Sequence, residues 1–131
     1  MKDSIKIGKN IFPTLFALTL AEQEKGLMGA EWPPPVMTFV YAGPRLNAFW
    51  MKNTISPLDI IFCLAGKIIA INRGLPHSTA IIGGHEPSDL VIELPAGTCE
   101  DIGIKVGDVV ELNYSKKSQM KAFLAKSGFN F

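Results

Sequence analysis

The chain has 131 residues, a formal net charge of +1, 47 % hydrophobic residues and 19 % charged residues. This composition is typical of one globular domain with its own core, and it argues against a disordered chain. The near-neutral charge excludes a strong overall attraction to nucleic acid or to an anionic membrane. No apolar run reaches the roughly 18 residues that a transmembrane helix needs.

Basic residues are concentrated in the C-terminal tail. Residues 115–131 contain four lysines and no acidic residue, and residues 1–114 carry a net charge of −3. We therefore predict a β-rich domain over residues 1–114 and a basic helix or tail over 115–131, packed on the domain or trailing from it. A solvated helix face is the simpler interpretation of the lysines, because no aromatic residues alternate with them to stack on bases.

The first third of the chain predicts short strands around one short helix. Alternating apolar residues indicate strands at residues 4–12 and 15–20. Thr19-Leu20-Ala21-Glu22 fits a capping box, so we expect a helix from residue 20 to about residue 28. Trp32-Pro33-Pro34-Pro35 is incompatible with helix or central strand. A stiff connector, with Trp32 covering the edge of the core, is favoured over a docking ligand for another protein.

Further strands are expected in the middle of the chain. We predict strands at residues 36–41 and 47–52, separated by a turn at 42–45. Residues 58–64 are almost free of polar side chains, which predicts a strand covered on both faces. The Ala65-Gly66 turn joins it to a strand at 67–73 and makes the clearest hairpin in the sequence.

The last part of the chain predicts one long loop followed by short elements. Residues 74–89 are rich in Gly and Pro and are expected to form a loop. The strand at 90–94 should place Val91 and Glu93 outward. One helical turn at 98–102, a strand at 109–114 and a helix at about 118–127 complete the chain. Met120, Phe123 and Leu124 fall on one face of that last helix.

These elements define the expected fold class. About eight short strands, one early helix and one late helix occur without the alternation of strand and helix that builds a parallel sheet. We predict a mainly β (α+β) fold of mostly antiparallel strands in a compact barrel-like or sandwich arrangement.

Cysteine and histidine usage argues against a metal or a cofactor. Cys63 and Cys99 form no C-x-x-C pair, and His85-Glu86 lacks a third ligand in register. We expect two free thiols, a cytoplasmic location, no metal and no cofactor. The lysines before the apolar run 11–21 resemble a signal peptide, but Pro13 breaks that run, so secretion is the less favoured alternative.

The densest mixture of aromatic, apolar and ionisable residues lies between residues 47 and 62. Asp59 is a carboxylate in an otherwise uncharged strand, so it needs a hydrogen bond or a counter-charge. Lys52 and Asn53 are the nearest partners across the bend at 53–57. One interpretation is a small polar site, with Trp50 as an apolar wall, Lys52 as a cation, Asn53 as an orienting amide and Asp59 as a base or ligand anchor.

The alternative for the same residues is structural. Asn53 would cap the bend with its own side chain. Asp59 would accept backbone N–H groups from residues 53–57 and be neutralised by Lys52. In that case the segment is a strand end with no chemistry of its own.

Several segments together carry a family resemblance. They are Lys25-Gly26-Leu27-Met28, Phe49-Trp50-Met51-Lys52-Asn53-Thr54, Pro57-Leu58-Asp59, Glu93-Leu94-Pro95-Ala96-Gly97 and Gly103-Ile104-Lys105-Val106-Gly107-Asp108. Over about residues 15–112 the chain resembles the prokaryotic family called domain of unknown function 192. The resemblance implies a compact β-rich fold with no assigned activity, and it supplies no catalytic residue. The family usually has arginine where Lys25 stands, and lysine cannot reproduce its bidentate fork.

We therefore expect an uncharacterised binding or accessory module rather than an enzyme. Its candidate surface lies around the 52–59 bend and the 74–89 loop. The alternative is a small hydrolase or lyase-type enzyme that uses Asp59 as acid–base catalyst with Lys52. Nucleic-acid contact through the basic tail is a weaker alternative. Nothing in the sequence specifies a partner or an oligomeric state.

Overall fold

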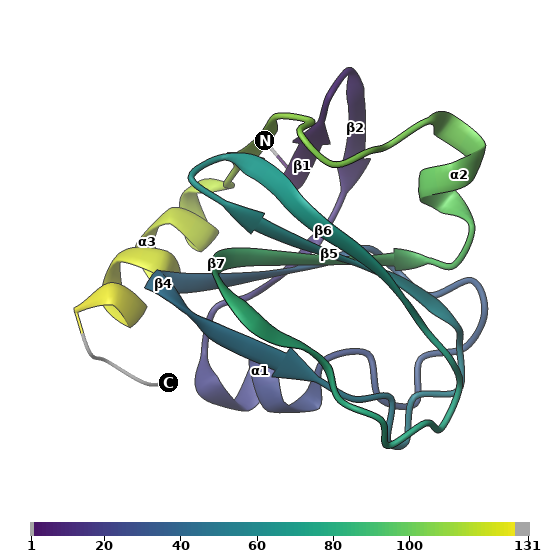
Figure 1. The fold of residues 1–131 in the computed structure, drawn as a ribbon. Coiled ribbons are helices and arrows are strands. Elements are labelled where there is room, and N and C mark those ends of the chain that lie inside the picture. The colour runs from purple at the N-terminus through teal and green to yellow at the C-terminus, as the bar shows by residue number, and fades with distance from the viewer. Residues whose placement is uncertain (1, 128–131) are drawn as a thin grey trace.

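The computed structural model describes residues 2–127, and its strands form two sheets (Figure 1). A three-stranded sheet has the order β2-β1-β8, and a five-stranded sheet has the order β3-β4-β7-β5-β6. Neighbouring strands are antiparallel except for β3 and β4. The elements are β1 (Ser4–Ile7), β2 (Asn10–Pro13), β3 (Leu15–Ala17), α1 (Leu20–Lys25), β4 (Met37–Phe49), β5 (Leu58–Leu64), β6 (Lys67–Gly74), β7 (Ile82–Pro95), α2 (Thr98–Ile102), β8 (Val110–Asn113) and α3 (Lys116–Lys126).

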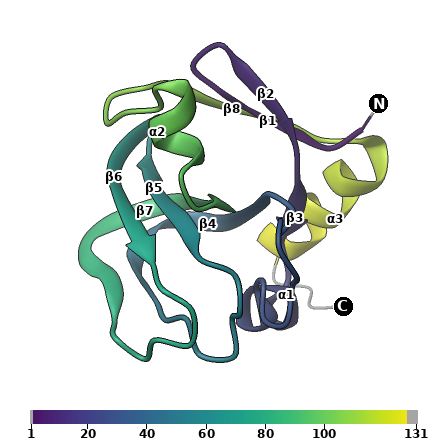
Figure 2. The same cartoon turned by 90° about the vertical axis from the view of Figure 1, so that its right-hand side faces the viewer.

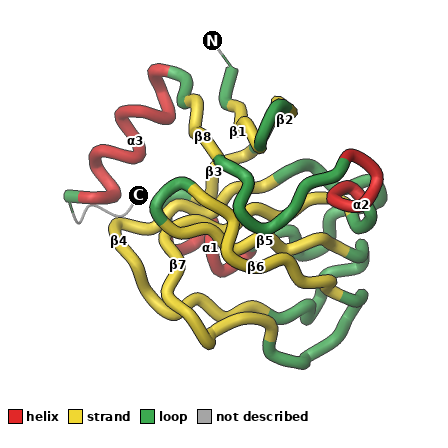
Figure 3. The backbone as a smooth tube through the Cα atoms, turned by 45° about the horizontal axis from the view of Figure 1, so that its top comes forward, coloured by secondary structure: helices red, strands yellow, loops and turns green. Residues whose placement is uncertain are grey.

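The predicted mainly β (α+β) class is confirmed. The arrangement within residues 2–127 is two open sheets and not one closed barrel. Helices α3 and α2 lie at opposite sides of the strands, and α1 lies behind them (Figure 3). None of the helices in the described part of the chain is long and apolar enough to cross a membrane.

The five-stranded sheet is buried on both faces. The hairpin β1–β2 and α2 lie on one side of it, and α1 lies on the other (Figures 1 and 2). Each side has its own apolar cluster: Ile61, Ile92 and Leu94 belong to one, and Ile60, Val91 and Phe39 belong to the other. Six of the seven residues of β5 are buried, as predicted for a strand covered twice.

The N-terminal segment contains more turns than the sequence pattern indicates. The single strand expected at 4–12 is two strands, because the chain reverses at Gly8 with a φ of +60°. The capping box of α1 is confirmed: the Thr19 hydroxyl accepts from Glu22 N at 3.2 Å, and Glu22 Oε1 accepts from Thr19 N at 3.1 Å. The helix ends at Lys25, three residues earlier than expected, because Gly26 takes a φ of +51°.

The strands predicted at 36–41 and 47–52 are one long strand, β4. Val40 pairs with Leu90 and Arg45 with Ser88. The residues expected to form a turn are therefore a bulge, in which four residues of β4 lie opposite a single residue of β7. Asn47 Nδ2 closes the bulge by donating to Ser88 O at 2.9 Å and to Ser88 Oγ at 2.7 Å. Residues 50–52 follow the strand and are not part of it.

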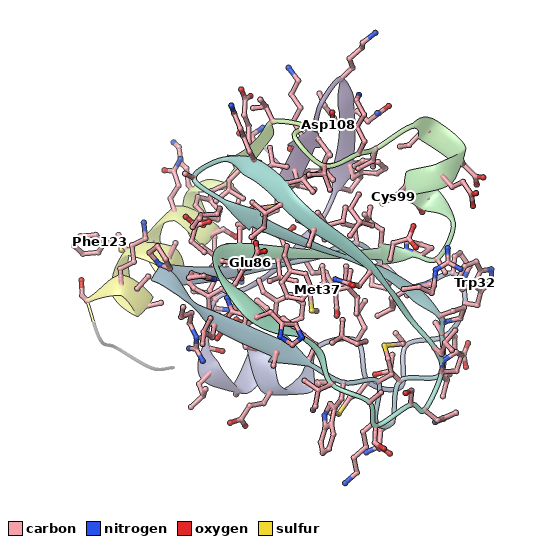
Figure 4. The ribbon with its side chains drawn as sticks, in the orientation of Figure 1. Trp32, Met37, Glu86, Cys99, Asp108 and Phe123 are labelled. Atoms are coloured by element: carbon pink, nitrogen blue, oxygen red, sulfur yellow. The ribbon has the colours of Figure 1, made fainter. Side chains whose placement is uncertain are left out.

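The prediction of a long loop over residues 74–89 is wrong for its second half, which is part of a strand. Strand β7 begins at Ile82, because its first residues pair with the end of β4. The outward placement of Val91 and Glu93 is also wrong: they are 0 % and 5 % exposed. Both lie on the face of β7 that α1 and its following segment cover. Trp32 does not cover the core edge either, since it is 56 % exposed (Figure 4).

Helix α3 packs through its small residues and not through the predicted apolar face. Ser118 and Ala122 are buried, whereas Met120 and Phe123 are 60 % and 65 % exposed, and Phe123 points away from the body (Figure 4). The reason is polar anchoring at the start of the helix. The Asp3 carboxylate accepts from Ser115 N at 2.7 Å and from Ser118 Oγ at 2.6 Å.

Gly83 should be the glycine that tolerates a side chain least. A Cβ there would lie 2.4 Å from Phe62 Cζ and 2.9 Å from the Asn47 carbonyl oxygen, and φ is +80°. Gly29 has a similar φ of +75° but open space around it. We expect Gly29→Ala to cost about 1 kcal/mol through backbone strain, and Gly83→Ala about 1–3 kcal/mol more through overpacking. Urea unfolding of the two variants measures this, and equal losses would contradict the packing around Gly83.

Candidate ligand-binding site

A cavity of about 450 Å³ lies between α1 and the five-stranded sheet. Its wall is formed by α1 and the residues after it, by β4, by residues 50–54, and by one residue each of β5 and β7. The wall combines apolar and aromatic side chains with polar and charged ones, namely Gln23, Glu24, Lys25, Arg45, Asn47, Thr54 and Glu93. A volume of this size is in the range of small-molecule sites.

Hydrogen bonds hold the α1 side of the cavity over the sheet. Gln23 Nε2 donates to Ala17 O at 3.1 Å and to Val40 O at 3.0 Å, which ties α1 to β3 and β4. The segment after α1 is tied to the bend after β4, because Gly29 N donates to Asn53 O at 2.9 Å. Ser56 Oγ donates to Ala30 O, also at 2.9 Å. The α1 side of the cavity is therefore held in place by hydrogen bonds to backbone carbonyl oxygens.

Aromatic rings form much of the wall. Phe39 and Phe49 meet edge to face with centroids 5.2 Å apart, and Phe49 meets Phe62 in the same way at 5.9 Å. Tyr41 and Trp50 complete the aromatic lining. Two cations stack on these outer rings: Arg45 Cζ lies 5.2 Å from the Tyr41 centroid, and Lys52 Nζ lies 5.2 Å from the Trp50 centroid.

Glu93 brings a carboxyl group into this apolar wall. It lies in the central strand β7, directly opposite Met37 of β4, which Figure 4 labels, and opposite Ile60 of β5. The residue is 5 % exposed, and burial raises the pKa of its carboxyl to about 8. A carboxyl with this pKa is mostly protonated at neutral pH.

No side chain or backbone group within residues 2–127 donates a hydrogen bond to the Glu93 carboxyl. In the same part of the chain, every completely buried side-chain oxygen or nitrogen has a hydrogen-bond partner. The carboxyl oxygens of Glu93 must therefore reach the cavity space. The hydrogen-bonding capacity of this carboxyl is therefore directed into the cavity and is open to a ligand.

Tyr41 lies within electrostatic range of both Arg45 and Glu93. Burial raises the pKa of the Tyr41 hydroxyl, the Arg45 charge opposes that rise, and the Glu93 charge adds to it. Tyr41 begins the bulge of β4 and Arg45 ends it. The bulge thus places the Tyr41 phenol near a carboxyl from the neighbouring strand, with Arg45 over the phenol ring.

Asp59 lies elsewhere, and its predicted pairing with Lys52, Asn53 or the backbone of residues 53–57 is wrong. Its carboxylate accepts from Arg73 Nε at 3.0 Å, from Gly97 N at 3.1 Å and from Cys99 N at 3.0 Å. Asp59 and Arg73 are directly opposite each other on β5 and β6. The carboxylate is 5 % exposed and joins the sheet to the start of α2.

The other three predicted site residues lie on the cavity side of the molecule. Trp50 lines the cavity. Lys52 is exposed on the Trp50 ring. Asn53 has a φ of +59° and contributes its backbone carbonyl to the Gly29 contact. Within residues 2–127, no three His, Cys, Asp or Glu side chains lie close enough to hold a metal ion.

Sequence reasoning missed the residue that gives the cavity its polarity. Glu93 stands between Ile92 and Leu94, and both of these neighbours are buried on the opposite face of β7, so alternation predicted an outward carboxyl. The usable signal was the run from Leu90 to Leu94, in which Glu93 is the single polar residue. A run of this kind is typical of a strand buried on both faces.

Fold and cavity together define a small α+β domain that carries an aromatic-walled site with one unpartnered carboxyl. The sequence matches the family DUF192, described as an uncharacterized ACR, over residues 4–112. The chain belongs to this family, which confirms the resemblance seen in the sequence. No curated protein matches it significantly.

Two crystal structures are similar to the chain. One is a protein of Sinorhizobium meliloti 1021 described as a "putative transcription regulator", with 33 % identity, a TM-score of 0.78, and coverage of 86 % of this chain and 94 % of that chain. The other is a protein of unknown function from Novosphingobium aromaticivorans DSM 12444. It shows 32 % identity, a TM-score of 0.75, and coverage of 82 % and 83 % of the two chains.

Asp59→Asn should destabilise the fold. The substitution removes the ion pair with Arg73 and places an amide donor against two backbone N–H groups. We expect a loss of about 2–3 kcal/mol in the free energy of unfolding. Asp101→Asn on the exposed surface of α2 makes the same chemical change and should have a small effect. Urea unfolding compares them, and an unchanged stability of Asp59→Asn would contradict the structural role.

Glu93 should make stability fall as pH rises. Its pKa goes from an ordinary value of 4.5 to about 8 in the folded protein, so the folded state keeps a proton that the unfolded state has lost. Stability is then complete below about pH 4.5, falls by at most about 1.4 kcal/mol per pH unit, and levels off above about pH 8. The free energy of unfolding of Glu93→Gln minus that of the native protein should therefore rise between about pH 4.5 and about pH 8. Glu86→Gln, exposed on the same strand, should show no such trend, and parallel pH profiles for Glu93→Gln and the native protein would contradict the raised pKa.

Proposed function

We propose that the chain is a small-molecule binding module whose site is the cavity between α1 and the five-stranded sheet. The observation that carries this proposal is the Glu93 carboxyl, which is buried in an aromatic wall and left without a hydrogen-bond partner in the described chain. Binding sites combine apolar walls with a few unsatisfied polar groups in this manner. The segment singled out in the sequence contributes Trp50, Met51, Thr54 and Leu58 to the same wall.

A binding role is favoured over catalysis by Asp59. Both oxygens of that carboxylate are engaged by Arg73 and by the start of α2. An acid–base catalyst needs an oxygen within reach of a substrate proton. Asp59 is outside the cavity wall, and Lys52 stacks on Trp50, so the two residues do not share a pocket floor.

The basic tail supports nucleic-acid contact less well. Lys121 is paired with Glu22 of α1, and α3 is anchored through Asp3. The description of the S. meliloti neighbour is compatible with a regulatory context for a ligand-binding domain. A cytoplasmic location is part of the proposal. It is supported by Cys63 and Cys99, which are buried free thiols.

A bulkier side chain at the rim of the cavity should weaken ligand binding while leaving the fold intact. Leu20 lines the cavity and is 58 % exposed, so Leu20→Trp adds bulk at its rim without entering the core. Leu75 is similarly exposed at 62 % and lies outside the cavity wall, so Leu75→Trp is the matched control. Fragments that shift the NMR signals of cavity residues should bind at least about tenfold more weakly to Leu20→Trp only. A fragment panel that shifts no cavity residue of the native protein would refute the proposal.

A further inference from the structure

Glu93 faces a cavity that offers it no positive partner of its own. Lys25 and Arg45 line the same cavity, but both are exposed, and neither charge lowers the pKa of Glu93: burial alone sets it. The strands next to β7 supply Met37 and Ile60 at this level, which are apolar. The carboxyl therefore lacks both a hydrogen bond and a counter-ion from the described chain.

The walls around the carboxyl favour positive charge. Phe39, Tyr41, Phe49 and Trp50 line the cavity, and the faces of aromatic rings attract cations, as Arg45 over Tyr41 and Lys52 over Trp50 show. Apolar surface that would contact the organic part of a ligand is added by Leu58 of β5 and by the residues after α1. A small inorganic cation would leave most of the 450 Å³ unfilled.

Resting on the proposed function, we infer that the cavity binds an organic ammonium ion, with the Glu93 carboxylate as its counter-ion and the aromatic rings against its apolar groups. An anionic ligand would place a second negative charge beside the ionised carboxylate, which is unfavourable. A neutral ligand would use only the hydrogen-bonding capacity of the carboxyl and would gain no cation–π attraction to Phe39 and Phe49, over which no cation of residues 2–127 lies.

Cation binding at this carboxyl is coupled to proton release. Below about pH 8 the free carboxyl holds a proton, which must leave when an ammonium ion binds. The affinity for a permanently charged cation should therefore rise roughly tenfold per pH unit up to about pH 8 and then level off. The other titratable or charged groups facing the site are Tyr41 and Arg45 of β4 and Glu24 and Lys25 of α1. The raised pKa of Tyr41 keeps its hydroxyl neutral across this range.

Three benzyl compounds test the inference on the native protein: benzyltrimethylammonium, benzyl alcohol and benzoate. Isothermal titration at several pH values should show the ammonium ion binding at least about tenfold more tightly than benzyl alcohol near pH 8, with about one proton released at lower pH. Benzoate should not bind measurably. NMR shifts of the cavity residues confirm the location.

Glu93→Gln keeps the shape of the side chain and removes its charge. It should lose at least about tenfold in ammonium affinity and lose the pH dependence, while its affinity for benzyl alcohol stays within about twofold. Glu86→Gln should behave as the native protein. Benzyl alcohol binding in the cavity without a preference for the ammonium ion would overturn the inference and leave the binding module standing. An ammonium affinity unchanged in Glu93→Gln would also overturn it. Absence of binding by all three compounds would count against the proposed function itself.

Discussion

The burial of the second half of strand β7, Leu90–Leu94, on both faces is the constraint on which the rest of the structure depends. β7 lies between β4 and β5, so its backbone groups pair on both sides and its side chains meet a core above and a core below the sheet. A strand in this position should be apolar throughout. Glu93 breaks that rule and carries a desolvation cost that no group in the described chain offsets. Real proteins break local rules of this kind mainly at functional sites.

Two carboxylates in neighbouring strands thus have opposite roles. Asp59 on β5 is buried, but it is satisfied by a guanidinium and two backbone N–H groups, and it fastens α2 to the sheet. Glu93 on β7 is 5 % exposed, has no hydrogen-bond partner in the described chain, and faces the cavity on the other side of the sheet. Sequence alone favoured Asp59 as the group with chemistry, although each is the one acidic residue of an apolar run, Leu58–Leu64 for Asp59 and Leu90–Leu94 for Glu93. Only the partners that the fold supplies distinguish them.

The partner of Asp59 shows why register escapes sequence reasoning. A two-residue turn at Ala65-Gly66 without irregularity would place Asn72 opposite Asp59. The pairing shifts by one residue between Phe62 and Cys63, which brings Arg73 there instead. A one-residue shift exchanges the faces of all later side chains. Nothing in the local sequence specifies that bulge, because it depends on how β6 accommodates the core beneath it.

The sequence by itself determined the local features of this protein: the β-rich class, the capping box of α1, the β5–β6 hairpin and the apolar character of the two central strands. Each depends on residues within a few positions of one another, through propensity, turn chemistry or alternation. Tertiary structure decided the long β4 with its bulge, the extension of β7 through the predicted loop, and the inward direction of Glu93. These features depend on pairing between β4 and β7, some forty residues apart in the chain. Such pairing is set by the packing of the whole core, and the candidate site exists only as its result.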